Sequence, residues 1–398
     1  MKKYIFLTGQ YMPTPGATGL CVHYLAKYLV STGYEVYTIC YENGSAQMWF
    51  DGVQIKHISV PQFMTGQTEK GWKGKWLVLQ SRLHKLVHLK KYPLRSTRLI
   101  RSYVRACKAL IQKGEEVTVV ASYVPLEAVV ALTKLKAEYP QINAVFYSTD
   151  TISNEQGEDG ILSKEQRTKA GMRWEFKLFD VVDKIIIMQC HEKHYFSQTY
   201  KKYHEKMFLA NFPLLEEPTM RVGMQTDDNK LVYAGTFYRK LRNPTFPLQT
   251  IAKALLGTEK KLFVLGGGDC DALVLDAVQA YSKHIEYLGM QSHEVAKKYL
   301  CEAAVLLSVG NEKSPMMPSK IYEYIATGKP IIHFYTWEED PCLPPLKLYG
   351  NALCIAKDDE QAVEKVREFI KHPQRKDFEQ IRQEFVSSTA QYTIAHME

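Results

Sequence analysis

The stretch "PSKIYEYIATGKPII", residues 318–332, joins a short helical segment to an apolar strand. Lys320 and Glu323 are three residues apart, so they share one face of the predicted helix. Lys320 falls in the first helical turn, where the positive end of the helix dipole disfavours a cation. The Thr-Gly-Lys-Pro sequence then ends the helix, and the strand begins. We therefore expect an anion to bind near Lys320.

The same alternation of apolar strands and amphipathic helices runs along the chain in two series. A polar stretch that contains proline, residues 211–230, separates the two series. Alternation of this kind is typical of a parallel, doubly wound sheet. It predicts an α/β fold with two Rossmann-like domains facing across a cleft, residues 1–211 and 212–376. The tail, residues 377–398, is predicted to form a terminal helix.

Length and composition are typical of a globular protein of two domains. The chain has 398 residues and no unbroken apolar run of the length that a membrane-spanning helix needs. The first residues carry an apolar run that is too short for a signal peptide, and we expect it to form a buried strand. The eight cysteines are scattered without a CxxC pair, which favours reduced thiols in the cytoplasm. The sequence "CHEKH", residues 190–194, has a poor spacing for zinc and is predicted to be a loop after a buried strand.

Positive charge is concentrated in one segment. Residues 70–114 hold thirteen Lys and Arg and no acid, so the rest of the chain carries −5 of the net charge of +8. Pro93 divides this segment into two predicted helices. The first combines tryptophans with lysines, which suits the headgroup boundary of an anionic membrane. The second carries a cationic stripe and an apolar face; the stripe is Arg98, Arg101, Arg105 and Lys108, and the apolar residues are Leu99, Tyr103, Ala106 and Leu110.

Two interpretations of the basic segment remain open. One is peripheral binding of an anionic membrane surface through residues 70–113, at roughly 1 kcal/mol for each basic residue near the surface. The other is a solvated structural face. A nucleic-acid-binding protein is a third class, but it leaves Lys320 and Glu323 unexplained, and we expect no nucleic acid partner.

Candidate ligand-binding residues follow the predicted strands, where open parallel sheets bind their ligands. Gly16 and Gly19 follow the first strand and precede a helix, and such glycines let backbone N–H groups approach an anion. Gly267 lies in "LGGGD", residues 265–269, after a strand of the second series. An ordinary strand-to-helix turn is the alternative at both places.

A second group of candidates lies in the loop after "KLVYAGT". Gly235 and Thr236 end a strand, and a cluster of cations follows them, namely Arg239, Lys240 and Arg242. Guanidinium groups bind phosphate bidentately and stay charged. A lysine such as Lys320 can bind a pyrophosphate, and the carboxylate of Glu323 can accept both hydroxyls of a ribose. A solvated loop and a surface ion pair are the alternatives, but together these residues favour a nucleotide diphosphate bound between the domains.

The chain resembles the retaining GT-B glycosyltransferases of the family-4 type over nearly its whole length. The resemblance is most specific at Pro318-Ser319-Lys320-x-x-Glu323-Tyr324-x-Ala326-x-Gly328-Lys329-Pro330, which is similar to the donor-binding motif of that family. It implies that Glu323 holds the donor ribose, that Lys320 and Arg242 bind the phosphates, and that Ser319 belongs to the same site. It also places Tyr287 and Leu288 at the base. The terminal helix would pack back onto the first domain.

Three positions depart from the pattern of this family. Pro315 stands where an acid is usual, and Glu312 is nearby but out of register. Thr236 stands where the family often has an arginine. Asp150 follows a strand after which the family often presents a histidine. Asp150 is expected either to contact the donor sugar or the acceptor hydroxyl, or to cap a helix.

These observations predict the transfer of a sugar, with UDP-sugars favoured, to a hydroxyl of a glycan or lipid-linked acceptor. Transfer with retention in cell-surface polysaccharide synthesis is expected, with Asp150, Arg242 and Lys320 as catalytic residues. Cations and helix N-termini would stabilise the leaving pyrophosphate, so no metal cofactor is required. The enzyme is expected in the cytoplasm, peripherally associated with the inner face of the cell membrane. A sugar-nucleotide epimerase on the same fold is the alternative enzyme class.

Overall fold

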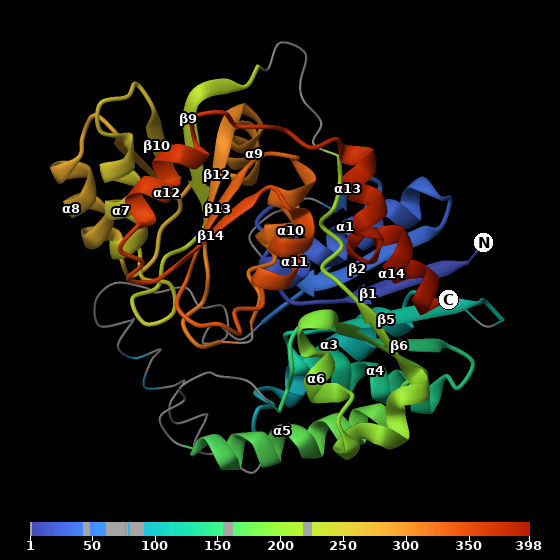
Figure 1. Cartoon of the computed structure of the whole chain (residues 1–398). Coiled ribbons are helices and arrows are strands. Elements are labelled where there is room, and N and C mark those ends of the chain that lie inside the picture. The colour runs from blue at the N-terminus through green and yellow to red at the C-terminus, as the bar shows by residue number, and fades with distance from the viewer. Residues whose placement is uncertain are drawn as a thin grey trace. The chain divides into compact units, whose positions relative to one another are not determined.

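The computed structural model describes residues 2–42, 48–60, 76, 79, 91–112, 114–153, 162–217, 225–314 and 316–398. These residues form two compact units. Unit 1 is Met1–Pro213 together with Ala390–Glu398, and unit 2 is Leu214–Thr389. Figure 1 shows that each unit is built around a twisted sheet with helices packed against it.

The sheet of unit 1 has the strand order β3-β4-β2-β1-β5-β6-β7-β8 among the described residues. All neighbouring strands are parallel except β3 and β4. Helices cover both faces of such a sheet, which explains why every residue of β1 is buried. The strands are β1 (Lys3–Leu7), β2 (Glu35–Tyr41), β3 (Trp49–Phe50), β4 (Val53–Ile58), β5 (Val117–Tyr123), β6 (Asn143–Ser148), β7 (Lys184–Met188) and β8 (Met207–Ala210).

Two of the described helices of unit 1 begin at a serine whose side chain caps the helix. Ser163, for example, forms a capping box with Gln166 at the start of α5. The described helices are α1 (Ala17–Ser31), α3 (Thr97–Lys108), α4 (Leu126–Glu138), α5 (Lys164–Phe179), the 3₁₀ helix η3 (Gln189–His191), α6 (Glu192–Tyr195), η4 (Gln198–Lys206) and α14 (Ala390–Met397).

The described part of the basic segment is helix α3 and the residues before it. The Ser96 side chain caps α3 by accepting from the backbone N–H of Leu99, and the buried Glu127 accepts from the N–H groups of Arg95 and Ser96 at 2.6 and 2.7 Å. The predicted apolar face is confirmed, since Leu99 and Tyr103 are buried in the core of unit 1. The first predicted helix of this segment lies outside the described residues, apart from positions 76 and 79.

The tail contains two helices and not one. α13 (Phe378–Glu384) is followed by η5 (Val386–Ser388), and both belong to unit 2. α14 belongs to unit 1, where it contacts α1, β7 and β8. The backbone carbonyl of Met397 accepts a hydrogen bond from Asn143 at 2.8 Å, and Glu398 accepts one from Tyr34 at 2.6 Å. The chain thus returns to unit 1 through its last nine residues.

The sheet of unit 2 is entirely parallel, with the strand order β11-β10-β9-β12-β13-β14 among the described residues. Its strands are β9 (Asp227–Ala234), β10 (Lys261–Leu265), β11 (Ile285–Gly289), β12 (Ala303–Val309), β13 (Ile331–Tyr335) and β14 (Ala352–Ala356). Its other helices are α7 (Thr245–Leu255), α8 (Asp271–Ala280), α9 (His293–Glu302), α10 (Lys320–Ala326), α11 (Leu343–Tyr349) and α12 (Ala362–Phe369). Together with the sheet of unit 1, this confirms the predicted α/β class with two parallel-sheet domains.

The contacts of Lys329 explain why a lysine stands in the Gly-Lys-Pro sequence that follows α10. Its side chain is buried, and its ammonium group donates to the backbone carbonyls of Leu300, at 2.9 Å, and of Cys301 and Ala303. Burial lowers the pKa of Lys329 to about 8. The lysine therefore fastens the end of α9 to the start of β13, and it is a structural residue.

No helix in the described parts of the chain combines the length and the apolar character that crossing a membrane would require.

Candidate functional site

Arg242 of unit 2 lies at the carboxyl ends of two adjacent strands. Its guanidinium group donates to the backbone carbonyl of Thr236, which follows β9, at 3.2 Å. It also donates to the side-chain oxygen of Asn311, which follows β12, at 2.7 Å. The Nε atom of Arg242 is buried and has no hydrogen-bond partner among the described residues. A buried donor of this kind is normally satisfied, so Arg242 has bonding capacity left for a ligand.

Tyr324 fixes helix α10 to the end of β9. Its hydroxyl accepts from the backbone N–H of Ala234 at 3.0 Å and lies 3.2 Å from the carbonyl oxygen of the same residue. The pKa of Tyr324 is raised, mainly by burial; Glu323 raises it further, and Arg242 opposes the shift. Both charged groups are therefore within electrostatic reach of this hydroxyl, and the structure brings Glu323 and Arg242 to one edge of the sheet.

Lys320 and Glu323 do not form the surface ion pair that was the alternative interpretation. Neither makes an ion pair with any described residue. The Oε1 atom of Glu323 is buried and accepts no hydrogen bond from the part of the chain that the structure describes. A buried acceptor that has no hydrogen bond costs roughly 1–3 kcal/mol of stability. A ligand that donates hydroxyl groups would remove this cost. Ser319, the residue before α10, is buried and makes no side-chain cap.

The glycines after β10 let two loops pack together. Gly266 and Gly268 have φ values of 154° and 138°, and a Cβ atom there would lie 1.7 Å from the carbonyl oxygen of Gly235 and 1.9 Å from that of Phe237. Gly267, the residue predicted from the sequence, has no such constraint, because a Cβ atom would meet only a methionine methyl group at 3.4 Å. The packing requirement for glycine thus falls on its two neighbours, Gly266 and Gly268.

Arg239 is held in this pair of loops by its backbone. Its N–H group donates to a carboxylate oxygen of Asp269 at 2.7 Å, and the side chain itself is exposed. Phe237 N–H donates to the carbonyl of Gly267 at 3.0 Å. The loop after β9 is therefore anchored to the loop after β10 at Phe237 and at Arg239.

Tyr287 and Leu288 of β11 make contacts inside unit 2. The Tyr287 hydroxyl lies 3.0 Å from the carbonyl of Gly266 and 2.8 Å from a carboxylate oxygen of Asp271. Burial, with Asp271 as the second cause, raises the pKa of Tyr287 to about 12. The carbonyl of Leu288 accepts from the side chain of Gln291 at 2.6 Å. Contacts of both residues with a base remain a prediction.

Glu312 is exposed, and its backbone N–H donates to the carbonyl of Leu241 at 2.6 Å. It therefore braces the loop that carries Arg242. Pro315, which occupies the position where an acid is usual, lies outside the described residues.

Gly16 and Gly19 line a cavity of about 300 Å³ in unit 1. The cavity is bounded by the loop after β1, by the start of α1 and by residues 123–127 at the end of β5, with Tyr41, Tyr92 and Arg95 at its wall. Gly19 is required here, since a Cβ atom would lie 1.9 Å from the backbone carbonyl oxygen of Gln10. The first turn of α1 therefore lies against the preceding loop at Gly19.

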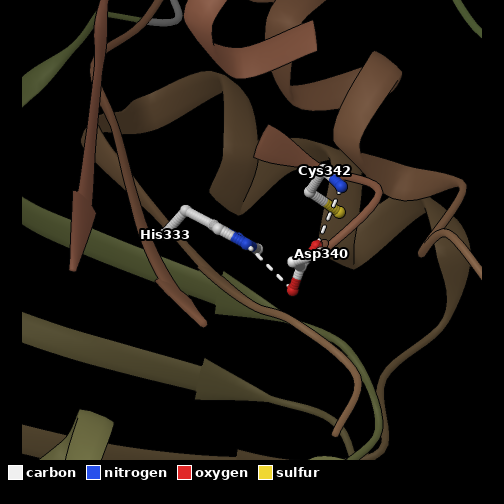
Figure 2. Close-up of side chains that lie close together, drawn as sticks. All are labelled: His333, Asp340 and Cys342. Carbon is white, nitrogen blue, oxygen red and sulfur yellow. Dashed lines mark hydrogen bonds and ion pairs between the residues drawn. The ribbon is translucent and has the colours of Figure 1, made fainter. Parts of the chain in front are cut away.

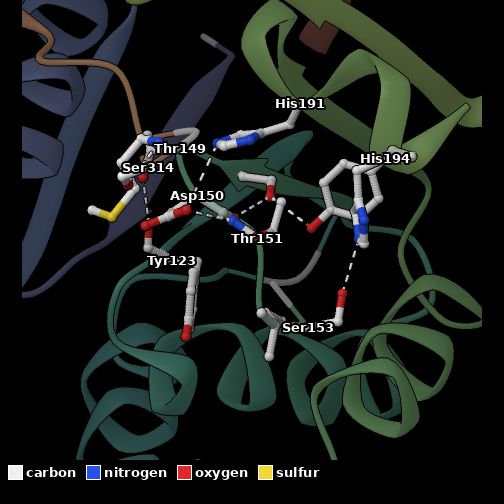
Figure 3. Close-up of polar contacts among 12 residues, drawn as sticks. Tyr123, Thr149, Asp150, Thr151, Ser153, His191, His194 and Ser314 are labelled. Atoms are coloured by element: carbon white, nitrogen blue, oxygen red, sulfur yellow. Dashed lines mark hydrogen bonds and ion pairs between the residues drawn. The ribbon is translucent and has the colours of Figure 1, made fainter. Parts of the chain in front are cut away.

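Asp150 lies beside a histidine that the sequence analysis did not assign. The Nε2 atom of His191 is 3.7 Å from a carboxylate oxygen of Asp150, which also accepts the N–H of Thr151 at 2.8 Å (Figure 3). His191 is buried, and burial together with the nearby His194 lowers its pKa to about 4. His191 is therefore neutral at physiological pH and can exchange hydrogen bonds with the carboxylate or with a ligand hydroxyl.

Glu175 supports the segment that follows Asp150. It is wholly buried, and one of its oxygens accepts from the backbone N–H groups of Ile152 and Ser153 at 3.0 Å each and from the Tyr195 hydroxyl at 2.9 Å. Burial of a carboxylate is tolerated where hydrogen bonds satisfy it. Glu175 is thus a positioning residue for the Asp150 loop.

The rule that selected Asp150 would also have found His191. Asp150 follows β6 and His191 follows β7, and the carboxyl ends of neighbouring parallel strands meet at one edge of a sheet. The sequence analysis instead treated residues 190–194 as an unremarkable loop. Among the described residues this stretch joins no group of metal-ligand side chains. Asn311, which holds Arg242, was also missed, although it follows β12 in the same way.

The fold is shared with several solved structures. The chain superposes on sucrose-phosphate synthase from Thermosynechococcus elongatus with a TM-score of 0.58 and 14% identity, over 100% of this chain and 95% of that one. It matches HepE of Anabaena in complex with UDP with a TM-score of 0.56 and 12% identity, over 99% and 98% of the two chains. WaaG, a glycosyltransferase involved in lipopolysaccharide biosynthesis, gives 0.54 and 14%, over 98% and 95%.

These likenesses show the fold over the full length of the chain, in agreement with the predicted GT-B architecture. No family model matches the sequence, and neither does any curated protein.

We predict that His191 makes the stability of the protein depend on pH. Its pKa in the folded state, about 4, is below the ordinary value of 6.5, so between these values only the unfolded chain binds the proton. The free energy of unfolding should therefore fall as the pH is lowered through this window, by an amount on the order of 2–3 kcal/mol. Chemical denaturation at both ends of the window would measure it.

The matched variants are His191→Asn and His372→Asn. His372 is an exposed histidine of unit 2, so its replacement should leave the pH dependence as in the wild type. His191→Asn should lose less stability than the wild type over the same window. Equal losses in the wild type and in His191→Asn would show that His191 is not held neutral by burial.

Proposed function

We propose that the protein is a glycosyltransferase that moves a sugar from a nucleotide-diphosphate sugar, with UDP-sugars favoured, to an acceptor hydroxyl with retention. Two observations carry this proposal: among the described residues, Glu323 Oε1 and Arg242 Nε are buried without hydrogen-bond partners, and both charges act on the Tyr324 hydroxyl. A ribose supplies two hydroxyl donors for a carboxylate, and a diphosphate supplies the anion for the cations. The shared fold supports the proposal, and the HepE structure contains UDP.

In this proposal Arg242 and Lys320 stabilise the diphosphate as it leaves. The charge that develops on the leaving group is the largest change along the reaction, and fixed cations lower its energy without rearrangement. These two cations would stabilise the charge on the leaving diphosphate without a catalytic metal. With no carboxylate assigned as nucleophile, the acceptor would attack from the same face that the diphosphate leaves, and the configuration at the sugar carbon would be retained.

Asp150 and His191 form the proposed acceptor-side pair in unit 1. Asp150 would accept a hydrogen bond from the attacking hydroxyl or from the donor sugar. The neutral His191, 3.7 Å away, would orient the carboxylate. The cavity that Gly16 and Gly19 line would receive part of the bound substrates.

We predict that Glu323→Ala lowers kcat/KM at least tenfold, because a charge-assisted hydrogen bond contributes about 1.5 kcal/mol or more. Arg242→Ala should lower kcat more than it raises KM if the guanidinium acts on the leaving group. The assay is release of nucleoside diphosphate from a panel of sugar nucleotides, with and without acceptor sugars.

Glu312→Ala is the matched control, because Glu312 is an exposed acid of the same unit. Its contact with Leu241 is made by its backbone N–H, which the substitution keeps. Its kinetics should equal those of the wild type. Wild-type kinetics in Glu323→Ala would remove the ribose-binding role. Formation of a new sugar nucleotide in place of free diphosphate would contradict transfer and favour the epimerase.

The acceptor is proposed to be a glycan, lipid-linked at the cytoplasmic face of a membrane, in cell-surface polysaccharide synthesis. Helix α3 supports this part of the proposal. Arg98, Arg101 and Arg105 are exposed and make no ion pair with the described residues, whereas Lys108 pairs with Glu138 at 2.5 Å. Three unneutralised arginines on one helix face suit an anionic lipid surface.

We predict that the protein co-sediments with vesicles that contain anionic lipid at low salt, and not with neutral vesicles. Replacing the three arginines with glutamine should weaken partitioning at least tenfold, since each basic residue contributes about 1 kcal/mol. The matched control replaces three exposed lysines elsewhere on unit 1, Lys134, Lys193 and Lys201, and should bind as the wild type does. If the wild type stays in the supernatant with anionic vesicles at low salt, the acceptor is a soluble molecule.

A further inference from the structure

A cluster of three metal-ligand side chains lies inside unit 2, in elements separate from Glu323 and Lys320. His333 belongs to β13, and Asp340 and Cys342 belong to the segment between β13 and α11 (Figure 2). All three are wholly buried, with at most 1% of the residue surface exposed. One nitrogen, one oxygen and one sulfur atom, one from each residue, lie within 4.8 Å of one another.

The two closest groups face each other without a hydrogen bond. His333 Nε2 and Asp340 Oδ2 are 3.5 Å apart, and neither atom has a hydrogen-bond partner among the described residues. A charge-assisted hydrogen bond would close to about 2.7–2.9 Å. Nitrogen and oxygen ligands that share a tetrahedral zinc ion at about 2.0–2.1 Å are separated by roughly 3.3 Å. The observed separation is closer to that of two metal ligands.

The His333 and Asp340 atoms that do not face each other have hydrogen-bond partners. His333 Nδ1 lies 3.0 Å from the hydroxyl of Ser308, and Asp340 Oδ1 accepts the backbone N–H of Cys342 at 2.8 Å. Ligating histidines and carboxylates commonly have partners of this kind on the atom that does not bind the metal. The arrangement leaves Nε2 and Oδ2 as the atoms turned toward the interior of the cluster.

A second thiol lies on the neighbouring strand, outside the group whose ligand atoms lie within 4.8 Å of one another. Cys354 of β14 is the register partner of His333 across the parallel pair β13–β14. Burial raises the pKa of Cys354 to about 11, and the charge of Asp340 raises it as well. This thiol is therefore within electrostatic reach of the carboxylate.

Gly310 leaves the space that the carboxylate occupies. A Cβ atom at this position would lie 1.9 Å from Asp340 Oδ2 and 3.3 Å from His333 Nε2. Gly310 directly precedes Asn311, which binds Arg242 at 2.7 Å. Whatever occupies the cluster therefore braces the segment that holds Arg242.

We propose that His333, Asp340 and Cys342 bind one zinc ion in a buried site. Nitrogen, oxygen and thiolate donors match the preferences of zinc. The site stabilises the end of β13 and the segment after β12. The proposal of this site does not depend on the proposed sugar transfer, and its test does not use activity.

The experiment begins with the purified full-length protein, stripped with a chelator and then reloaded with zinc alone. Elemental analysis should give one zinc ion per chain, and the midpoint of thermal unfolding should rise on reloading. Cobalt substitution should produce a thiolate-to-cobalt charge-transfer band. A wild-type protein that takes up no zinc and shows no change in unfolding midpoint would overturn the proposal, leaving a buried histidine–aspartate pair.

Variants identify the ligands. Cys342→Ser should abolish or strongly reduce the charge-transfer band and weaken zinc binding at least tenfold. Cys301→Ser, which changes another buried cysteine of the same unit, should keep both. Unchanged zinc affinity in Cys342→Ser, or cobalt binding to the wild type without a charge-transfer band, would place any metal elsewhere and contradict the site.

Discussion

The hydrogen bonds between the Tyr324 hydroxyl and the backbone of Ala234 determine how the candidate site of unit 2 is assembled. Ala234 is the last residue of β9, so this contact joins a helix to a strand end that is distant in sequence. Glu323 precedes the tyrosine, and the loop that leads to Arg242 follows the alanine. One buried interaction therefore places a carboxylate and a guanidinium group, each with bonding capacity left, at one sheet edge.

The sequence was sufficient to predict the fold because both sheets are parallel, apart from the β3–β4 pair, and are covered on both faces. Strands buried in this way are nearly continuous apolar runs, as in β1 and β12, and they are separated by helices, some of which have side-chain caps. The same regularity located much of the candidate site, since residues that follow parallel strands meet at one edge. Gly235 and Arg242 were selected by this reasoning, whereas Glu323 was selected because it shares a helix face with Lys320.

Other features depend on contacts that no local pattern contains. The sequence motif suggested Gly267, but the packing of the loops requires glycine at the neighbouring positions 266 and 268. His191 was overlooked because residues 190–194 were judged only by their spacing as zinc ligands, which is poor. Its position after β7 is what places it near Asp150. The proposed zinc ligands span residues 333–342 without any metal-binding spacing and are brought together only by the turn from β13 into α11.

Thermal unfolding of the wild type and of Glu323→Ala, each with UDP, GDP, dTDP or ADP, tests the central claim most directly. A ligand present at a hundred times its Kd stabilises the native state by about 2.7 kcal/mol, which corresponds to a shift of several degrees for domains of this size. The account predicts that UDP raises the midpoint of the wild type the most and that Glu323→Ala loses most of this shift. If none of the four nucleoside diphosphates shifts the wild-type midpoint, the site does not bind a nucleotide donor.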